Sequence, residues 1–309
     1  MKPAFETAAY TAGWRAVRAL PEPVARAVFQ RGADAVLRRN GQAVQRLRAN
    51  LARVLPTNIT PIELSAAVQA GVRSYARYWM EAFRLPTWSP QRVRENFVFD
   101  NPELLFQAYA QGRGVICVLH HSGNWDHAGA WASASGMPVV TVAERLKPEA
   151  LYRRFVRYRE ELGMEILPAS GGAQAPLDVM TRRLEEGRIV VLLADRDLSR
   201  RAIDVTFFGH PARMPGGPAL LALRTGAPLL VVSLWFDGKL CRGRLNPAIP
   251  IPSSGDSRSK ISVITQRMAD GFAAGIAEHP QDWHMMQRLW LDHKAAATSQ
   301  PTPSFPSKS

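Results

Sequence analysis

The chain has 309 residues, of which 46% are hydrophobic and 21% charged, and its formal net charge is +13. This composition excludes an intrinsically disordered protein and fits one large domain or two small ones. Only Cys117 and Cys241 are cysteines, which excludes a disulfide framework and a cysteine metal cluster and makes a reducing, cytoplasmic environment the default expectation. Residues 1–23 contain no apolar run long enough for a signal peptide or a membrane span.

The positive charge comes mainly from arginine, because only six of the 39 basic residues are lysines. One interpretation is an anionic partner, and another is the codon usage of a GC-rich genome. No zinc finger, RNP-like aromatic strand or helix-turn-helix spacing occurs, so an anionic membrane surface or an acidic substrate fits better than a nucleic acid. We therefore expect no nucleic-acid partner and a protein that lies on a membrane without crossing it.

Residues 1–96 are predicted to be mainly helical. Two segments have apolar residues at helical spacing and arginines on other faces; the apolar positions are Tyr10, Trp14, Val17 and Leu20 in the first and Val44, Leu47, Leu51 and Val54 in the second. Such helices suit a membrane interface, and they equally suit packing on a core with a solvated basic face. A further helix is predicted to begin at Thr60, where a capping box is followed by proline, and to end at Pro86.

From about residue 97 onward, short apolar segments alternate with helical segments. The predicted strands lie at residues 114–121, 138–144, 164–169, 188–196, 203–208, 227–236 and 240–247. Strands that are apolar on both faces and separated by helices indicate a largely parallel central sheet flanked by helices. The expectation is an α/β fold with one domain over residues 1–294, whose sheet-containing core spans 97–294, and a disordered tail at 295–309.

The first strand of this core ends in a candidate catalytic pair. Ligands of open parallel sheets bind at the carboxyl ends of the strands, where His121 stands five residues before Asp126, across a Ser-Gly-Asn turn. We expect the turn to bring the Asp126 carboxylate to the His121 ring, because a histidine held by a carboxylate acts as a general base for a hydroxyl. No serine lies in a G-x-S-x-G sequence, so the hydroxyl is expected to belong to the substrate and to attack an acyl ester or thioester.

A metal site is the alternative for the same stretch. Its ligands would be His120, His121, Asp126 and His127. Adjacent strand residues point to opposite faces, and no further histidine or cysteine has ligand spacing, so we expect no metal. His120 and His127 are then interpreted as bystanders.

Further polar residues follow the neighbouring predicted strands. They are Asp195, Arg196 and Asp197 after one strand, Glu144 and Arg145 after another, and Arg159 on the helix that follows. Acidic and basic residues at such an edge indicate either groups that serve a site or a surface cluster of ion pairs. Arg213 precedes a predicted helix at 216–224, whose N-terminus is expected to hold a phosphate or another anion.

Ordered blocks over most of the chain resemble a known family. They are HSGNWD (121–126), AERLKPEALYRRFVRYREELGMEILP (143–168), IVVLLADRDLSRRAIDVTFFGHPARMPGGPALLALRTGAPLLVV (189–232) and WHMMQRLW (283–290). They are similar to the bacterial lysophospholipid-acyltransferase-like group, which contains the lipid A late acyltransferases and the phosphatidylinositol mannoside acyltransferases. The resemblance implies an α/β domain with a hydrophobic acyl groove and an H-x4-D/E motif whose histidine is the general base.

Carried over by position, the resemblance makes His121 the base, Asp126 the motif acid and Asp195 an acidic residue near the base. It leaves open whether Asp126 or Asp195 holds the His121 ring. The residues expected to bind substrate are Asn124 and Trp125, which also shape the turn, together with Glu144, Arg145, Arg159, Arg196, Asp197 and Arg213. The resemblance implies no bound cofactor.

Two features favour one branch of the family. Lipid A acyltransferases usually carry a membrane-spanning helix and H-x4-E and use acyl carrier protein, whereas this chain has basic amphipathic helices and Asp126. It looks more like a phosphatidylinositol mannoside acyltransferase, and the arginine bias agrees with an actinobacterial origin. The resemblance implies a peripheral protein on the cytoplasmic face of the inner membrane, among anionic lipids, that moves a palmitoyl-type chain from acyl-coenzyme A (acyl-CoA) to a mannose 6-hydroxyl of a mannosylated phosphatidylinositol.

Three other interpretations stay open at this point. The first is a lipid A-type acyltransferase that takes its acyl group from acyl carrier protein. The second is a catalytically silent protein that binds anionic glycolipids through its basic helices. The third is an esterase, because a site of this kind can pass an acyl group to water.

Overall fold

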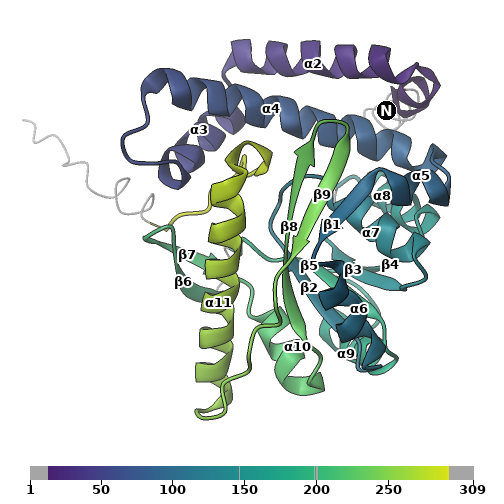
Figure 1. The fold of residues 1–309 in the computed structure, drawn as a ribbon, viewed down its shortest axis with the longest axis vertical. Helices are drawn as coiled ribbons and strands as arrows, with labels where there is room; N and C mark the ends of the chain where they lie inside the picture. The colour runs from purple at the N-terminus through teal and green to yellow at the C-terminus, as the bar shows by residue number, and fades with distance from the viewer. Residues whose placement is uncertain (1–12, 146, 198, 200, 292–309) are drawn as a thin grey trace, which may run out of the picture.

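The structure, a computed structural model, describes residues 13–145, 147–197, 199 and 201–291. Its N-terminal helices precede a seven-stranded sheet and a separate two-stranded sheet (Figure 1). The predicted tail at 295–309 and Tyr10 of the first predicted helix lie outside the described residues.

The N-terminal part is helical, as predicted. A helix at residues 13–19 is followed by α2 (Glu22–Arg39), α3 (Gln42–Val54), α4 (Pro61–Arg84), the short 3-10 helix η1 (Leu85–Thr87) and α5 (Pro90–Glu95). The capping box that begins α4 is confirmed, because the Thr60 hydroxyl accepts a hydrogen bond from the Glu63 backbone N–H and the Glu63 carboxylate accepts one from the Thr60 backbone N–H. Among the described residues, no helix has the length and apolar character needed to traverse a bilayer.

The central sheet has the order β1-β9-β8-β2-β5-β3-β4. Its elements, with the helices between them, are β1 (Phe97–Asp100), α6 (Pro102–Ala110), β2 (Val115–Leu119), α7 (Trp125–Ala134), β3 (Val139–Ala143), α8 (Glu149–Glu161), β4 (Met164–Pro168), α9 (Pro176–Glu185), β5 (Ile189–Leu193), α10 (Gly217–Thr225), β8 (Leu229–Asp237) and β9 (Leu240–Leu245). β8, β2, β5, β3 and β4 pair in parallel, whereas β9 is antiparallel to β8. The predicted α/β fold with a largely parallel sheet is confirmed.

The strand predicted at 203–208 does not belong to the central sheet. It is β6 (Ile203–Phe207), which pairs with β7 (His210–Met214) in a separate hairpin. The turn between them has positive φ at Phe208 and Gly209, which a tight hairpin of this twist requires. β7 was not predicted from the sequence, and neither was the long helix α11 (Ser257–Glu278), which is followed by the 3-10 helix η2 (Pro280–Asp282).

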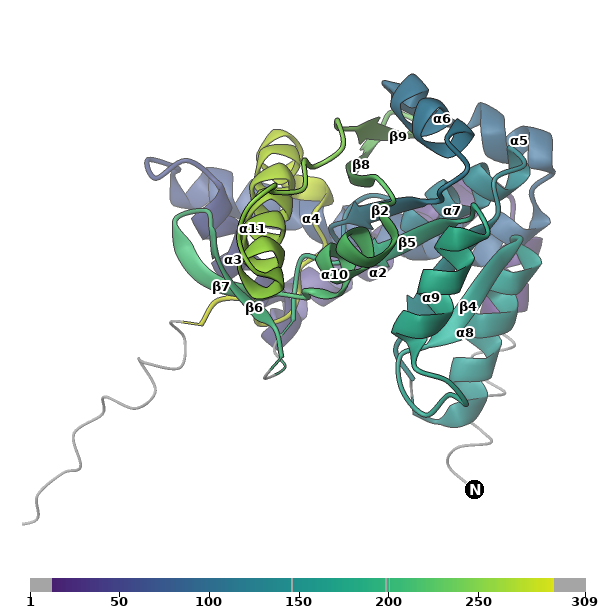
Figure 2. The same cartoon turned by 90° about the horizontal axis from the view of Figure 1, so that it is seen from below.

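The core lies on both faces of β2, the central buried strand. Val115, Cys117 and Leu119 pack in the cluster that includes α6 and α7, whereas Ile116 and Val118 pack in the cluster formed with α9, α10 and α11. Figure 2 shows α6 and α10 on opposite sides of β2. At the carboxyl edge of the sheet, Arg77 of α4 donates hydrogen bonds to the backbone carbonyls of Gly238, Lys239 and Leu240. α4 therefore covers the edge at which parallel sheets bind ligands.

Candidate active site

His121 and Asp195 meet at the carboxyl ends of two adjacent strands. β2 and β5 pair in parallel with Leu119 opposite Leu193, and His121 and Asp195 each follow by two residues. Asp195 Oδ1 lies 2.5 Å from His121 Nδ1, and Asp195 Oδ2 accepts a hydrogen bond of 3.0 Å from the His121 backbone N–H. The strand register therefore places a carboxylate directly against the imidazole.

Asp195 is fully buried, and its surroundings favour the ionised form. Burial by itself raises the pKa of Asp195, but the His121 charge and the hydrogen bonds from His121 and Trp283 hold that pKa well below its usual range. An ionised carboxylate keeps the ring proton of a neutral histidine on Nδ1 and leaves Nε2 with a free lone pair. The His121 side chain is 36% exposed, so a substrate can reach it.

Asp126 does not hold the His121 ring, and the expectation that the turn would bring them together is wrong. One oxygen of its buried carboxylate accepts a hydrogen bond of 2.9 Å from the Tyr78 hydroxyl, and the other accepts one of 2.7 Å from Arg159 Nε. Burial alone would lower the pKa of Arg159. The charges of Asp126 and Tyr78 outweigh that effect, so the pKa of Arg159 is raised and the Asp126–Arg159 pair is ionic. Because α7 begins at Trp125, Asp126 points toward α4 and α8 and ties the three helices together.

The turn between His121 and Asp126 has a defined geometry. The side chain of Asn124 caps α7 by accepting a hydrogen bond from the His127 backbone N–H, and it donates one to Glu81. Gly123 has φ 57°, and a Cβ there would lie 2.9 Å from the backbone of Leu234, so only glycine fits. The Trp125 ring stands edge-on to the His121 ring, with centroids 5.7 Å apart. Trp125 thus flanks the His121 ring, whereas the buried Asn124 side chain fixes the turn.

The other histidines of the stretch have separate partners. The His120 ring is hydrogen-bonded to the Ser122 hydroxyl, and His127 Nε2 donates to the Val93 carbonyl at 2.9 Å. Burial lowers the pKa of His120 to about 4 and also lowers the pKa of His127. In the described parts of the chain, no group of three or more histidine, cysteine, aspartate or glutamate side chains is arranged to hold a metal ion.

The remaining predicted residues lie around this centre with partners of their own. Two of them form ion pairs, Arg145 with Glu149 at 2.9 Å and Arg213 with Asp204 at 2.6 Å. Two others bond to the backbone: Arg196 donates to the Arg288 carbonyl at 3.2 Å, and Asp197 accepts from the Ser199 N–H at 2.7 Å. Glu144 is exposed after β3. None of these five side chains forms a hydrogen bond or ion pair with His121 or Asp195 within the described structure. The guanidinium of Arg213, which was expected to bind an anion, is instead paired with Asp204.

Two residues that the sequence did not single out, Trp283 and His284, complete the centre. Trp283 Nε1 donates to Asp195 at 3.0 Å, and the His284 backbone N–H donates to the His121 carbonyl at 2.7 Å. Burial, followed by the charges of His121 and His120, lowers the pKa of His284 to about 3. The sequence block 283–290 contained both residues, but nothing in it indicated that Trp283 contacts a residue 88 positions earlier or that His284 contacts one 163 positions earlier.

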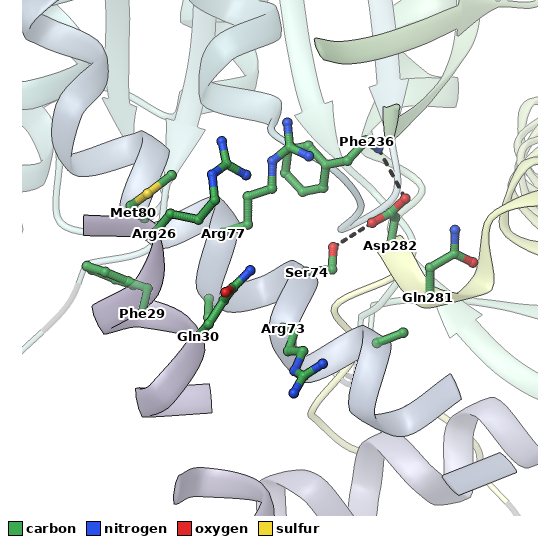
Figure 3. A pocket seen from close by; sticks show the side chains of 12 residues that line it. Arg26, Phe29, Gln30, Arg73, Ser74, Arg77, Met80, Phe236, Gln281 and Asp282 are labelled. Carbon is green, nitrogen blue, oxygen red and sulfur yellow. Dashed lines mark hydrogen bonds between the residues drawn. The ribbon is translucent and has the colours of Figure 1, made fainter. Parts of the chain in front are cut away.

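The His284 ring is oriented by a hydrogen-bonded chain. The Ser74 hydroxyl donates to Asp282 at 2.5 Å, and the Phe236 backbone N–H also donates to Asp282 (Figure 3). The same hydroxyl lies 2.9 Å from His284 Nε2. Because the single Ser74 proton goes to Asp282, His284 Nε2 is the donor and Nδ1 is an acceptor. Nδ1 is buried and has no hydrogen-bond partner among the described residues.

An apolar groove of about 600 Å³ runs between α2 and α4. Its lining residues are Val28, Phe29, Gly32, Ala33, Val36, Val72, Tyr75, Ala76, Trp79, Phe83 and Met286. The ring of Tyr75, one of these lining residues, lies 5.2 Å from the His284 ring. A smaller cavity of about 50 Å³ lies beneath Trp125, between α7 and the sheet. The structure therefore contains an apolar groove between α2 and α4.

Residues 3–292 match the family described as bacterial lipid A biosynthesis acyltransferase. The phosphatidylinositol mannoside acyltransferase of Mycolicibacterium smegmatis is 48% identical over 284 residues, which cover 91% of this chain and 90% of the relative. The enzyme of the same name from Mycobacterium tuberculosis is also 48% identical, over 287 residues that cover 92% and 88% of the two chains. The resemblance inferred from the sequence blocks is confirmed. The chain belongs to the bacterial lipid A biosynthesis acyltransferase family and is an O-acyltransferase.

Proposed function

We propose that this O-acyltransferase moves a palmitoyl-type chain from acyl-CoA to the 6-hydroxyl of a mannose in a phosphatidylinositol mannoside. The observation that carries the proposal is the His121–Asp195 pair, which provides a general base at the ligand-binding edge of the sheet. The choice of acceptor rests on two 48% identical relatives that are named phosphatidylinositol mannoside acyltransferases.

The reaction needs one proton to move twice. His121 Nε2 takes the proton of the mannose hydroxyl as the oxygen attacks the thioester carbonyl, and the ionised Asp195 stabilises the imidazolium that forms. The new C–O bond then replaces the C–S bond, and the imidazolium returns its proton to the leaving thiolate. The products are the mannosyl ester and free coenzyme A, and His121 is restored without any bound cofactor.

Neighbouring polar groups are proposed to orient the acceptor. His284 Nδ1 is a buried acceptor beside the base and suits a second sugar hydroxyl. The Asp126–Arg159 ion pair positions α7, and with it Trp125, against His121. The candidates for binding the headgroup or the donor remain Asn124, Trp125, Glu144, Arg145, Arg159, Arg196, Asp197 and Arg213.

The groove between α2 and α4 is proposed to hold the acyl chain. Burial of a 16-carbon chain contributes roughly 10 kcal/mol gross at about 0.8 kcal/mol per methylene, which requires a long apolar surface near the base. The groove supplies about 600 Å³ of such space and reaches Tyr75, next to His284.

A peripheral position on the cytoplasmic face of the inner membrane fits the surface of the chain. The formal charge of +13 favours an anionic leaflet, where each basic residue contributes about 1 kcal/mol. α2 also exposes three large apolar side chains, Val24, Val28 and Val36. An apolar stripe with surrounding arginines is the pattern of a helix that lies in a membrane interface.

An acyl-transfer assay tests this function. Palmitoyl-CoA and palmitoyl-acyl carrier protein are each offered with a purified mannosylated phosphatidylinositol and with a lipid A precursor. The expected result is transfer from coenzyme A to the mannolipid, with a loss of about 10²–10⁴ in rate for His121→Ala. Preferred transfer to the lipid A precursor would identify a lipid A-type acyltransferase instead. Thioester hydrolysis that outpaces transfer would identify an esterase, and binding without turnover would identify a glycolipid-binding protein.

A further inference from the structure

A second cleft, of about 430 Å³, lies between the helix at residues 13–19 and α8. Among its described lining residues are five arginines and one acid, namely Arg15, Arg18, Arg153, Arg154, Arg157 and Glu161. Trp14 and Tyr158 form its aromatic wall. This cleft is separate from the His121 centre and from the groove between α2 and α4, with which it shares no lining residue.

Two of the five arginines of this cleft, Arg18 and Arg154, stack on Trp14. Its ring is faced by the Arg18 guanidinium at 5.5 Å and by the Arg154 guanidinium at 4.9 Å. The buried Trp14 donates its Nε1 hydrogen to the Phe83 carbonyl at 2.9 Å and packs on Tyr158, with ring centroids 5.4 Å apart. These two guanidinium groups are already positioned, so they lose less side-chain entropy when the cleft binds a ligand.

Among the described residues that line the cleft, arginines outnumber acids by five to one. In the pocket of Figure 3 every arginine has a close carboxylate, because Arg26, Arg73 and Arg77 pair with Glu22, Asp34 and Glu81 at 3.2, 2.9 and 2.6 Å. In the cleft the ion pairs are longer, with Arg18–Glu161 at 4.0 Å and Arg153–Glu149 at 3.6 Å. No carboxylate of a described residue lies within 4.0 Å of Arg15 or Arg157.

Mutual repulsion accompanies this excess. Burial, followed by the charges of Arg18, Arg15 and Arg157, lowers the pKa of Arg154, and Glu161 opposes the shift. A bound anion relieves such repulsion and gains several charge-assisted hydrogen bonds at once.

The position of the cleft in the chain indicates where its anion comes from. The helix at 13–19 leads through Pro21 directly into α2, which exposes Val24, Val28 and Val36 on one helical stripe with exposed fractions of 46%, 50% and 44%. The same N-terminal segment therefore combines arginines with an exposed apolar stripe, and the boundary between lipid headgroups and acyl chains offers partners to both.

We propose that this cleft binds the phosphate group of an anionic membrane-lipid headgroup. The assignment deepens the proposed function, because it rests on the peripheral membrane position and names the contact that orients the protein there. When the cleft holds a headgroup phosphate, α2 lies against the boundary between headgroups and acyl chains. The protein is then oriented toward the leaflet that contains the lipid acceptor.

Vesicle binding tests the proposal with two matched variants. The cleft variant combines Arg15→Gln, Arg153→Gln and Arg157→Gln, and the control variant combines Arg113→Gln, Arg182→Gln and Arg258→Gln; all six arginines are exposed, and both variants lose the same charge. Co-sedimentation is measured with phosphatidylcholine vesicles alone and with phosphatidylinositol added. Near an anionic surface each arginine contributes about fivefold in affinity, so the cleft variant is expected to bind phosphatidylinositol vesicles roughly 100-fold more weakly, and the control variant only a few-fold more weakly.

Two outcomes would overturn the proposal. If both variants lost the same affinity for phosphatidylinositol vesicles, only general surface charge would matter. If the cleft variant lost affinity for free coenzyme A but kept its affinity for the vesicles, the cleft would bind the phosphates of the donor. Thermal unfolding of both variants checks that each is folded. Because vesicle binding needs no turnover, a failure of the proposed acyl transfer leaves this test intact.

Discussion

The carboxylate of Asp195 accepts two hydrogen bonds from one residue, His121, at 2.5 Å from the ring Nδ1 and at 3.0 Å from the backbone N–H. Trp283 supplies a third hydrogen bond to the same carboxylate. The ring and the strand end that carries it are thus fixed by one buried ion. Asp195, and not the motif acid Asp126, is the partner of the proposed base.

Asp195→Asn is expected to lower kcat for acyl transfer by about 10²–10⁴ with little change in KM, because an amide no longer stabilises the imidazolium or fixes the ring tautomer. The double variant with His121→Ala is expected to be no slower than His121→Ala alone, since groups that act as a unit are not additive. Steady-state kinetics of the three variants measure this. A double variant that is slower by the product of the two single effects would show that Asp195 acts independently of His121.

The Asp126 network is expected to control stability more than chemistry. Asp126→Ala leaves the Arg159 guanidinium buried without its acid, which is expected to reduce the free energy of unfolding by about 3–5 kcal/mol. Tyr78→Phe removes only one hydrogen bond to the same carboxylate and is expected to cost about 1.5–3 kcal/mol. Urea unfolding gives both values. If Tyr78→Phe changed kcat as strongly as Asp195→Asn while the stability stayed constant, the network would have a direct part in the reaction.

The sequence predicted the edge of the sheet at which the site lies, but not the pairing within it. His121 and Asp126 are five residues apart and look like a local pair, whereas His121 and Asp195 are 74 residues apart and meet only because β5 lies next to β2. Strand order is decided by how the helices pack on the two faces, which local patterns do not encode. The contact of His284 with His121 depends on the same long-range packing.

The elements with strong local chemistry were predictable, and those without it were not. The capping box at Thr60 and the apolar strands of the core appear in the structure as expected. β7 was missed because Pro211, its second residue, argues against a strand, although a two-stranded hairpin tolerates it. α11 was missed even though its buried residues Ile264, Met268, Phe272 and Ile276 recur every four positions, a spacing that indicates one buried helical stripe.

The free energy of unfolding is expected to fall between pH 6.5 and pH 4. The pKa of His120 is about 4 and that of His284 about 3 in the folded chain, because both are buried, against about 6.5 for an unfolded histidine. Below pH 6.5 the unfolded chain therefore binds protons that the folded chain excludes, which removes about 3 kcal/mol per histidine by pH 4. Urea unfolding at pH 7, 6 and 5 measures the slope, and His284→Gln is expected to make it shallower. An unchanged slope in that variant would contradict the assignment to His284.

Chain-length selectivity is expected to depend on Gly32, which lines the groove between α2 and α4 and has open space where a Cβ would lie. Gly32→Phe puts a ring into that space and is expected to reduce kcat/KM for palmitoyl-CoA by roughly tenfold or more, because an overfilled groove excludes the distal methylenes, while octanoyl-CoA is affected much less. Gly32→Ala is the matched control and is expected to keep the palmitoyl preference while stabilising α2 by about 1 kcal/mol. Equal effects of Gly32→Phe on both donors would place the acyl chain elsewhere, and the cavity beneath Trp125 would then be the next site to block.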